Sequence, residues 1–344
     1  MLDARTWSPA HLPDDATPRL MVIVDTEEEF DWSAPFDRAA TGVAHIRHQQ
    51  RAHDVFDRYG LKPTYLMDYP VVSQPDGYGP LLELFQDGRC AIGTHLHPWV
   101  SPPFDEPVSR PNSYPGNLPA ALEEEKLRVL THAIADRFGV RPTVYRAGRY
   151  GAGPNTADIL DRLGYEIDTS VVPRSDFRDD HGPDFRHCGA RPYWFGSGRD
   201  GGRRLLELPL TVGFTGLAAG IGHHLHGALT SSWGSRARLQ GITARLGLLD
   251  RLRLSPEGIG SDDHIRLTRA FLRAGHKVFA LTYHSPSLDV GHTPYVRCET
   301  DLTLFMDRLK RYCDFFFGEI GGAPATPDDI LTLVNRGQQT VSDR

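Results

Sequence analysis

The sequence has no apolar run approaching the ~18 residues that a membrane-spanning helix requires. Its start, MLDARTWSPAHLPDD, also lacks the positive region and apolar stretch of a secretory signal, so we expect a cytoplasmic protein. A basic surplus is missing as well. The chain has 38 Lys and Arg against 44 Asp and Glu, a formal net charge of −6, which argues against a nucleic-acid-binding protein.

Cysteine is scarce in this sequence. The four cysteines, Cys90, Cys188, Cys298 and Cys313, form no CxxC pair, so their spacing predicts neither a disulfide framework nor a zinc ribbon. The remaining composition, 40% hydrophobic and 24% charged over 344 residues, is typical of a globular protein with a large buried core. We predict one catalytic domain over residues 1–344.

Seven short runs rich in β-branched and aromatic residues alternate with segments of helical periodicity. This alternation predicts βα units, a parallel sheet and hence an α/β fold. The runs are RLMVIV, PTYLM, RCAIGT, PTVY, GYEI, RLLELPL and KVFALTY. Six of them are followed by an ionisable residue. Polar residues follow many strands simply because loops do, but the carboxyl ends of parallel barrel strands meet at one mouth, where barrel enzymes keep their chemistry.

The segment 212–260 is too long for a simple βα connection, and we predict that it forms an inserted helical segment or lid. It contains His223, His224 and His226, a cluster with the composition of a metal site. Because no carboxylate accompanies these histidines in their glycine-rich loop, a structural or solvent-exposed role is favoured.

Two carboxylates follow the first apolar run, in the sequence VDTEEEFDW. Asp25 and Glu27 are two residues apart, so in extended chain their side chains face the same side. Such a pair is suited to divide the roles of base and metal ligand. The neighbouring Glu28, Glu29 and Asp31 are predicted to be solvated.

Two histidines with the same spacing follow the third run, in GTHLHPWVSPPFDE. Pro98 disfavours the helical region for His97, which keeps His95 and His97 extended and their imidazoles on one face. Two imidazoles and one carboxylate make a three-ligand zinc site with an open position. We therefore predict that Glu27, His95 and His97 bind one divalent metal ion, with zinc the expected ion.

Two further strand ends carry candidate catalytic groups. Arg146 in TVYRAGRYGAG would hold a neighbouring Asp25 ionised and oriented, although an arginine that pairs structurally with any nearby carboxylate fits the pattern equally well. His284 in FALTYHSPSL ends the last run, and an imidazole at such a position is suited to general acid catalysis near neutral pH.

Over roughly residues 20–290, the order of these motifs resembles the polysaccharide deacetylases of the NodB-homology type, carbohydrate esterase family 4, in a bacterial branch associated with surface polysaccharides. The resemblance implies a distorted (β/α)7 barrel in which Asp25 is the catalytic base, Glu27 a metal ligand and His284 a catalytic histidine. The Arg-Tyr-Gly motif of the family corresponds to Arg146 with Tyr150 and Gly151. One residue more than usual separates Arg146 from Tyr150.

The metal-binding motif departs from the family pattern. The family spaces its two histidine ligands four residues apart, and that position holds Trp99 here. Either His97 serves as the second histidine ligand or the site is incomplete, and a member without catalytic activity stays an alternative.

The predicted function is a metal-dependent hydrolase that removes N- or O-linked acetyl groups from a carbohydrate. Trp99, Tyr150 and Tyr283 are predicted to provide stacking surface for the sugar, although aromatic residues at such positions serve equally often in packing. Two alternatives are a cytosolic amidohydrolase that cleaves non-peptide C–N bonds of a small molecule and a metal-free carbohydrate-binding or assembly protein. The sequence predicts neither the sugar nor an oligomeric state.

Overall fold

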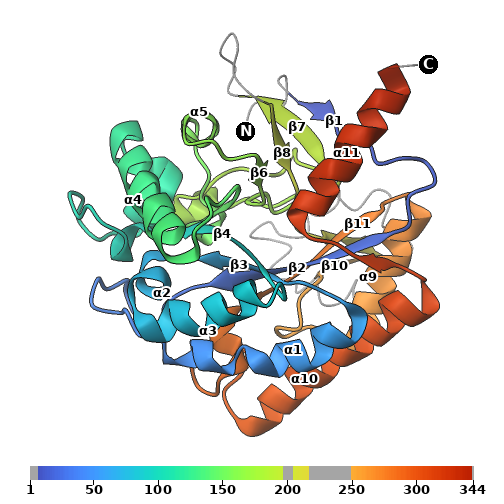
Figure 1. Cartoon of the computed structure of the whole chain (residues 1–344), viewed down its shortest axis with the longest axis horizontal. Coiled ribbons are helices and arrows are strands. Elements are labelled where there is room, and N and C mark those ends of the chain that lie inside the picture. The colour runs from blue at the N-terminus through green and yellow to red at the C-terminus, as the bar shows by residue number, and fades with distance from the viewer. Residues whose placement is uncertain (1–6, 197–203, 217–248, 343–344) are drawn as a thin grey trace.

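A ten-stranded sheet lies at the centre of the described residues, which are 7–196, 204–216 and 249–342 of a computed structural model (Figure 1). Its strands are β1 (Ser8–Pro9), β2 (Arg19–Thr26), β3 (Thr64–Met67), β4 (Ala91–Leu96), β5 (Val144–Ala147), β6 (Ile167–Asp168), β7 (Tyr193–Gly196), β8 (Arg204–Glu207), β11 (Val278–His284) and β12 (Ala323–Pro324). The spatial order is β1-β7-β8-β6-β5-β4-β3-β2-β11, with β12 paired to β2. The strands from β8 to β11 in this order are all parallel, and β7 and β1 add antiparallel pairs.

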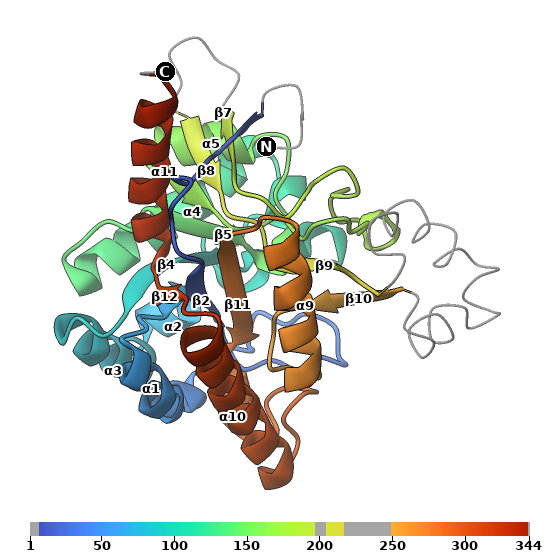
Figure 2. The same ribbon diagram turned by 90° about the vertical axis from the view of Figure 1, so that its right-hand side faces the viewer.

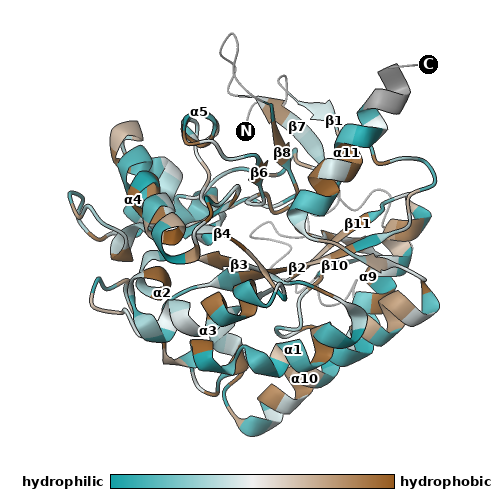
Figure 3. Cartoon of the chain, in the orientation of Figure 1, coloured by the Kyte–Doolittle hydropathy of each residue, from teal (hydrophilic) through white to brown (hydrophobic). Residues whose placement is uncertain are grey.

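Each of the seven predicted strands is present, and the predicted α/β class with a parallel sheet is confirmed. The apolar runs are continuous because the parallel strands are buried on both faces. On β2, Leu20, Val22 and Val24 belong to the larger apolar core, whereas Met21 and Ile23 belong to a second core on the opposite face. In Figure 3, much of β2, β3 and β4 at the centre is coloured as hydrophobic.

Helices cover the outside of the sheet (Figures 1 and 2). They are α1 (Gln50–Phe56), α2 (Tyr69–Ser73), α3 (Pro75–Gln86), α4 (Ala120–Phe138), α5 (Thr156–Arg162), α9 (Ser261–Arg273), α10 (Glu299–Cys313) and α11 (Pro327–Ser342). Neighbouring helices pack in sequence around the sheet, α5 on α4, α4 on α2 and α3, α1 on α10, and α10 on α9. By contrast, α11 places Ile330 and Val334 in the second core, which we call the inner core.

The sheet is not closed by a strand pair within the described residues, but backbone hydrogen bonds connect its β11 end to the segments that follow β8 and β6. The N–H of Thr282 on β11 donates to the carbonyl O of Leu254 (3.1 Å), and Leu254 N–H donates to Thr211 O (2.9 Å). Leu210 N–H then donates to Val171 O, just beyond β6 (3.0 Å). The chain thereby surrounds the inner core in the manner of a distorted barrel.

The predicted insertion at 212–260 falls largely outside the described residues, which omit 217–248 and with them His223, His224 and His226. The described ends of this segment are strands, β9 (Val212–Thr215) and β10 (Asp250–Arg253), which pair with each other as an antiparallel ribbon. Among the described helices, none has the length and apolar character needed to cross a bilayer.

Candidate active site

The predicted catalytic residues meet above the inner core because side chains alternate along each strand. Val278 and Ala280 on β11 face the inner core, and His284 follows on the same face. Asp25 continues the face of Met21 and Ile23 on β2. The carboxyl ends of the parallel strands therefore place these polar groups side by side.

Asp25 forms a buried ion pair with Arg146 of β5. The Nη1–H of Arg146 donates to Asp25 Oδ1. Arg146 is held in turn by Thr169, whose carbonyl O and Oγ1 accept from its Nε (both 3.0 Å). Burial, the largest single effect, raises the pKa of Asp25, but the charge and hydrogen bond of Arg146 together with His95 and His284 outweigh it and leave the pKa below its usual range. Asp25 is therefore an ionised carboxylate with a fixed orientation.

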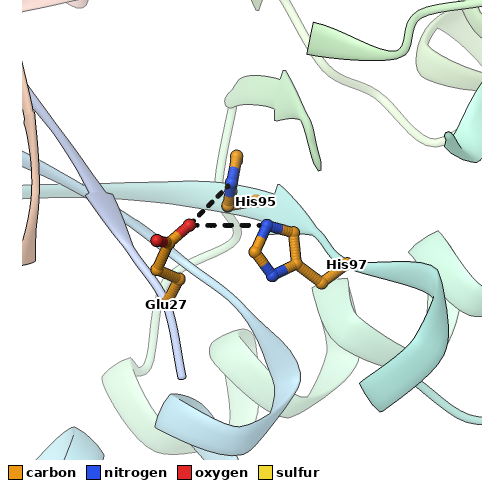
Figure 4. A group of neighbouring side chains, drawn as sticks. All are labelled: Glu27, His95 and His97. Carbon is orange, nitrogen blue, oxygen red and sulfur yellow. Dashed lines mark ion pairs between the residues drawn. The ribbon is translucent and has the colours of Figure 1, made fainter. Parts of the chain in front are cut away.

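Glu27, His95 and His97 converge beside this ion pair (Figure 4). Glu27 Oε2 lies 3.7 Å from His95 Nε2 and 3.5 Å from His97 Nε2. The other nitrogen of each ring is occupied, because His95 Nδ1–H donates to Arg146 O (3.1 Å) and His97 Nδ1–H donates to Glu28 Oε2 (2.8 Å). Both Nε2 atoms consequently carry lone pairs that point toward Glu27.

The chemistry of this group fits a divalent metal ion. Glu27 Oε1 is buried and has no hydrogen-bond partner among the described residues. Burial and the negative charges of Glu28 and Asp25 raise the pKa of Glu27 well above its usual range. The ionised Glu27 carboxylate therefore needs a nearby positive charge to be stable in this position. Burial lowers the pKa of His95 to about 3 and of His97 to about 4, which keeps both imidazoles neutral as ligands must be.

Glu28 supports His97 on the side away from Glu27. Its Oε1 accepts from Trp99 Nε1–H (2.7 Å) while its Oε2 accepts from His97, and the Trp99 ring stacks on the His97 ring at 4.2 Å. Asp68 completes the arrangement by accepting from the backbone N–H groups of Glu28 (2.7 Å) and Val71 (2.9 Å). Glu28, Asp68 and His97 also lie close enough to hold a cation, but these hydrogen bonds already account for their positions.

His284 is oriented by a carboxylate that the strand-end pattern did not identify, Glu257. The Nδ1–H of His284 donates to Glu257 Oε2 (2.9 Å), and Glu257 Oε1 accepts from Ser287 Oγ–H (2.6 Å). The opposite ring nitrogen, Nε2, lies 3.8 Å from Asp25 Oδ2. Burial alone lowers the pKa of His284, but the charge and hydrogen bond of Glu257 outweigh it and raise the pKa above its ordinary value.

Asp25, Glu27, His95, His97 and His284 border one cavity of about 700 Å³. Tyr150 lines it, in a left-handed backbone conformation (φ 59°) that is uncommon for a residue with a side chain. Arg149, which precedes it, has the same conformation (φ 53°). This tight turn brings the chain after β5 to the cavity wall.

Two of the three predicted sugar-stacking residues need correction. Tyr283 is 1% exposed and packs against Phe305 in the larger core, because it precedes His284 and so faces the opposite side of β11. Trp99 borders the cavity but is only 2% exposed, since His97 and Phe36 cover its ring. The prediction that Glu28 is solvated is also wrong, because Glu28 is fully buried.

The sequence contained a signal for Glu28 but a weaker one for Glu257. A run that is apolar at every position is buried on both faces, so the residue after Glu27 also points into the protein. Glu257 precedes His284 by 27 residues and follows no apolar run. Only the folded chain places it beside the histidine.

No protein-family model matches the sequence, and no curated protein matches it. Solved structures share its fold. A chain from Mycobacterium smegmatis assigned as a polysaccharide deacetylase is 15% identical, with 96% of each chain covered and a TM-score of 0.54. One from Pseudomonas aeruginosa with the same assignment is 14% identical (96% and 94% covered, TM-score 0.53), and the allantoinase PuuE gives the same values. The protein therefore has the α/β fold found in polysaccharide deacetylases.

Replacing His97 by Ala is expected to lower metal occupancy strongly, because three ligands leave no redundancy. The measurement is elemental analysis of protein purified without chelator. His132→Ala, which alters a histidine on the outer helix α4, is the control and should hold as much metal as the parent. Equal metal content in the His97 variant would show that another residue completes the site.

Gly148→Ala is expected to weaken the site by crowding. A Cβ at Gly148 would lie 2.3 Å from the carbonyl O of Leu96 and 2.6 Å from Cδ2 of His97, so the end of β4 that carries the proposed ligand must shift. We expect about 10-fold weaker metal binding and a loss of about 1–3 kcal/mol in the free energy of unfolding. Gly79→Ala, where nothing lies within 4 Å, is the control. Unchanged metal affinity in the Gly148 variant would contradict the prediction.

Proposed function

We propose that this protein is a metal-dependent hydrolase that removes N- or O-linked acetyl groups from a carbohydrate, with zinc as its metal. The observation that carries the proposal is the meeting of three different groups at one cavity. These are the Asp25–Arg146 ion pair, the Glu257–His284 pair and the metal-binding group of Glu27, His95 and His97. The fold shared with polysaccharide deacetylases supports the same class.

A divalent metal ion held by Glu27, His95 and His97 would supply Lewis acidity that polarises the acetyl carbonyl and lowers the pKa of water to about 7. The protein would provide the remaining functions. Asp25, kept ionised by Arg146, accepts the proton of the attacking water. The backbone N–H of Tyr150 stabilises the oxyanion that develops on the acetyl group.

His284 then serves as the general acid. Its Nδ1–H is committed to Glu257, which leaves Nε2 to donate a proton to the departing amine or alcohol. The raised pKa of His284 favours its protonated form, while the lowered pKa of Asp25 favours the ionised carboxylate. The acid and the base are thus kept in opposite charge states by different partners.

The second candidate is an amidohydrolase that cleaves a non-peptide C–N bond of a small molecule. The fold shared with an allantoinase keeps this candidate open. A substrate screen for released acetate against released ammonia separates the two hydrolases. A protein that holds no metal and releases neither product would instead support the carbohydrate-binding or assembly role.

Asp25→Asn is expected to reduce acetate release by about 10²–10⁴-fold, because an amide does not accept the proton of water. Metal content, measured on the same preparation, should stay at the parental level, since Asp25 is not among the three proposed ligands. Undiminished acetate release by a variant that retains its metal would remove Asp25 from the mechanism.

The pH dependence of kcat/KM should be bell-shaped, with an acid limb from the base and an alkaline limb from the general acid. Glu257→Gln removes the charge that raises the pKa of His284, so the alkaline limb should move to lower pH. Rates on an alkyl acetate ester measured across pH test this shift. An unmoved alkaline limb would mean that a group other than His284 limits the rate there.

A further inference from the structure

The wall of the cavity beside His284 is formed by two aromatic rings. Trp32 is 36% exposed and meets the His284 ring edge-on at 5.0 Å. Tyr295 contacts Trp32 at 5.9 Å, and its ring lies nearly parallel to that of His284 (9°, 6.4 Å). Aromatic faces of this kind provide a surface for a sugar ring, here directly beside the proposed general acid.

Arg253, the last residue of β10, lies at the edge of this aromatic wall. Its guanidinium carbon is 5.7 Å from the centre of the Tyr295 ring, and its side chain is 31% exposed at the cavity. Its ion pair among the described residues is with Glu257 Oε2 at 3.7 Å, longer than a hydrogen bond. Glu257 is already engaged by His284 and Ser287.

The other charged groups of the cavity have nearer partners, either an opposite charge or a hydrogen-bond donor. Arg149 and Arg110 both donate to Asp180, and Asp25 accepts from Arg146. Asp31 accepts from the backbone and hydroxyl of Ser33 at the exposed rim. Glu27 faces the proposed cation. Arg253 is therefore the cavity arginine that, among the described residues, lacks a close carboxylate.

We propose that Arg253 binds an oxyanion group of the substrate, a carboxylate or a phosphate, and that the substrate is an acidic sugar. The planar guanidinium presents paired donors that match the oxygens of either group. A sugar ring on Trp32 and Tyr295 would place its anionic substituent at Arg253 and its acetyl group toward His284 and the metal ligands. This inference rests on the proposed deacetylase function, whose substrate class it specifies.

Calorimetric titration with D-glucuronate, D-glucose 1-phosphate and D-glucose tests the anion site directly. The acidic sugars should bind more tightly than glucose, and the tighter of the two identifies the group as carboxylate or phosphate. Arg253→Met should weaken binding of the acidic sugar by about 10–100-fold, as expected for the loss of a charge-assisted hydrogen bond. Binding of glucose should change less.

Two further variants serve as controls for this result. Arg253→Lys keeps the charge but not the paired donors, so its affinity should lie between those of the parent and the Met variant. Arg269→Gln removes an exposed arginine of α9 that pairs with Glu319 outside the cavity, and it should bind like the parent. An Arg253→Met variant that binds acidic sugars as tightly as the parent overturns the proposal. The proposal is also overturned if removal of the metal abolishes binding of the acidic sugars while Arg253→Met does not weaken that binding.

Acetate release from an acetylated glucuronoside and the matching glucoside provides the kinetic test. The parent should prefer the glucuronoside through a lower KM, and Arg253→Met should abolish that preference. Equal rates on both substrates in parent and variant would reject the anion site while leaving the deacetylase function intact. Binding of acidic sugars through Arg253 without acetate release from any substrate would reject the deacetylase function and leave the anion site standing.

Discussion

The buried ion pair between Asp25 on β2 and Arg146 on β5 links two strands that are separated by β3 and β4 in the sheet. A carboxylate at this depth is strongly unfavourable without a cation or hydrogen-bond donors. Arg146 also connects the two halves of the site, because its side chain holds Asp25 while its carbonyl oxygen accepts from His95. The position of the proposed base and the tautomer of a proposed metal ligand thus depend on one residue.

The same requirement explains the partners of two other buried carboxylates at the site. Glu28 is compensated by donors from His97 and Trp99, and Glu257 by His284 and Ser287. Glu27 differs from these two, since its buried Oε1 has no hydrogen-bond partner among the described residues. An unpaired buried carboxylate is costly unless a ligand supplies the missing charge, and this is the physical reason for placing a metal ion there.

The fold alone does not select the reaction, because it is shared with proteins that bear different names, an allantoinase among them. Specificity depends on what borders the cavity. Here the aromatic wall of Trp32 and Tyr295 and the guanidinium of Arg253 belong to segments that follow β2, β11 and β9. The proposed metal ligands come instead from the ends of β2 and β4. Glu27 and Trp32 both follow β2, whereas Arg253 and Tyr295 come from segments that supply none of the proposed metal ligands.

The sequence by itself determined the seven parallel-sheet strands and the ionisable residues at their ends. Continuous apolar runs are buried on both faces, and the alternation of side chains groups Asp25 with Glu27 and His95 with His97. Only the tertiary structure covered Trp99 and brought Glu257 to His284 and Glu28 to His97. Glu257 and His284 are 27 positions apart in the sequence, and Glu28 and His97 are 69 positions apart. No local pattern specifies which distant segments meet when the sheet curves around its inner core.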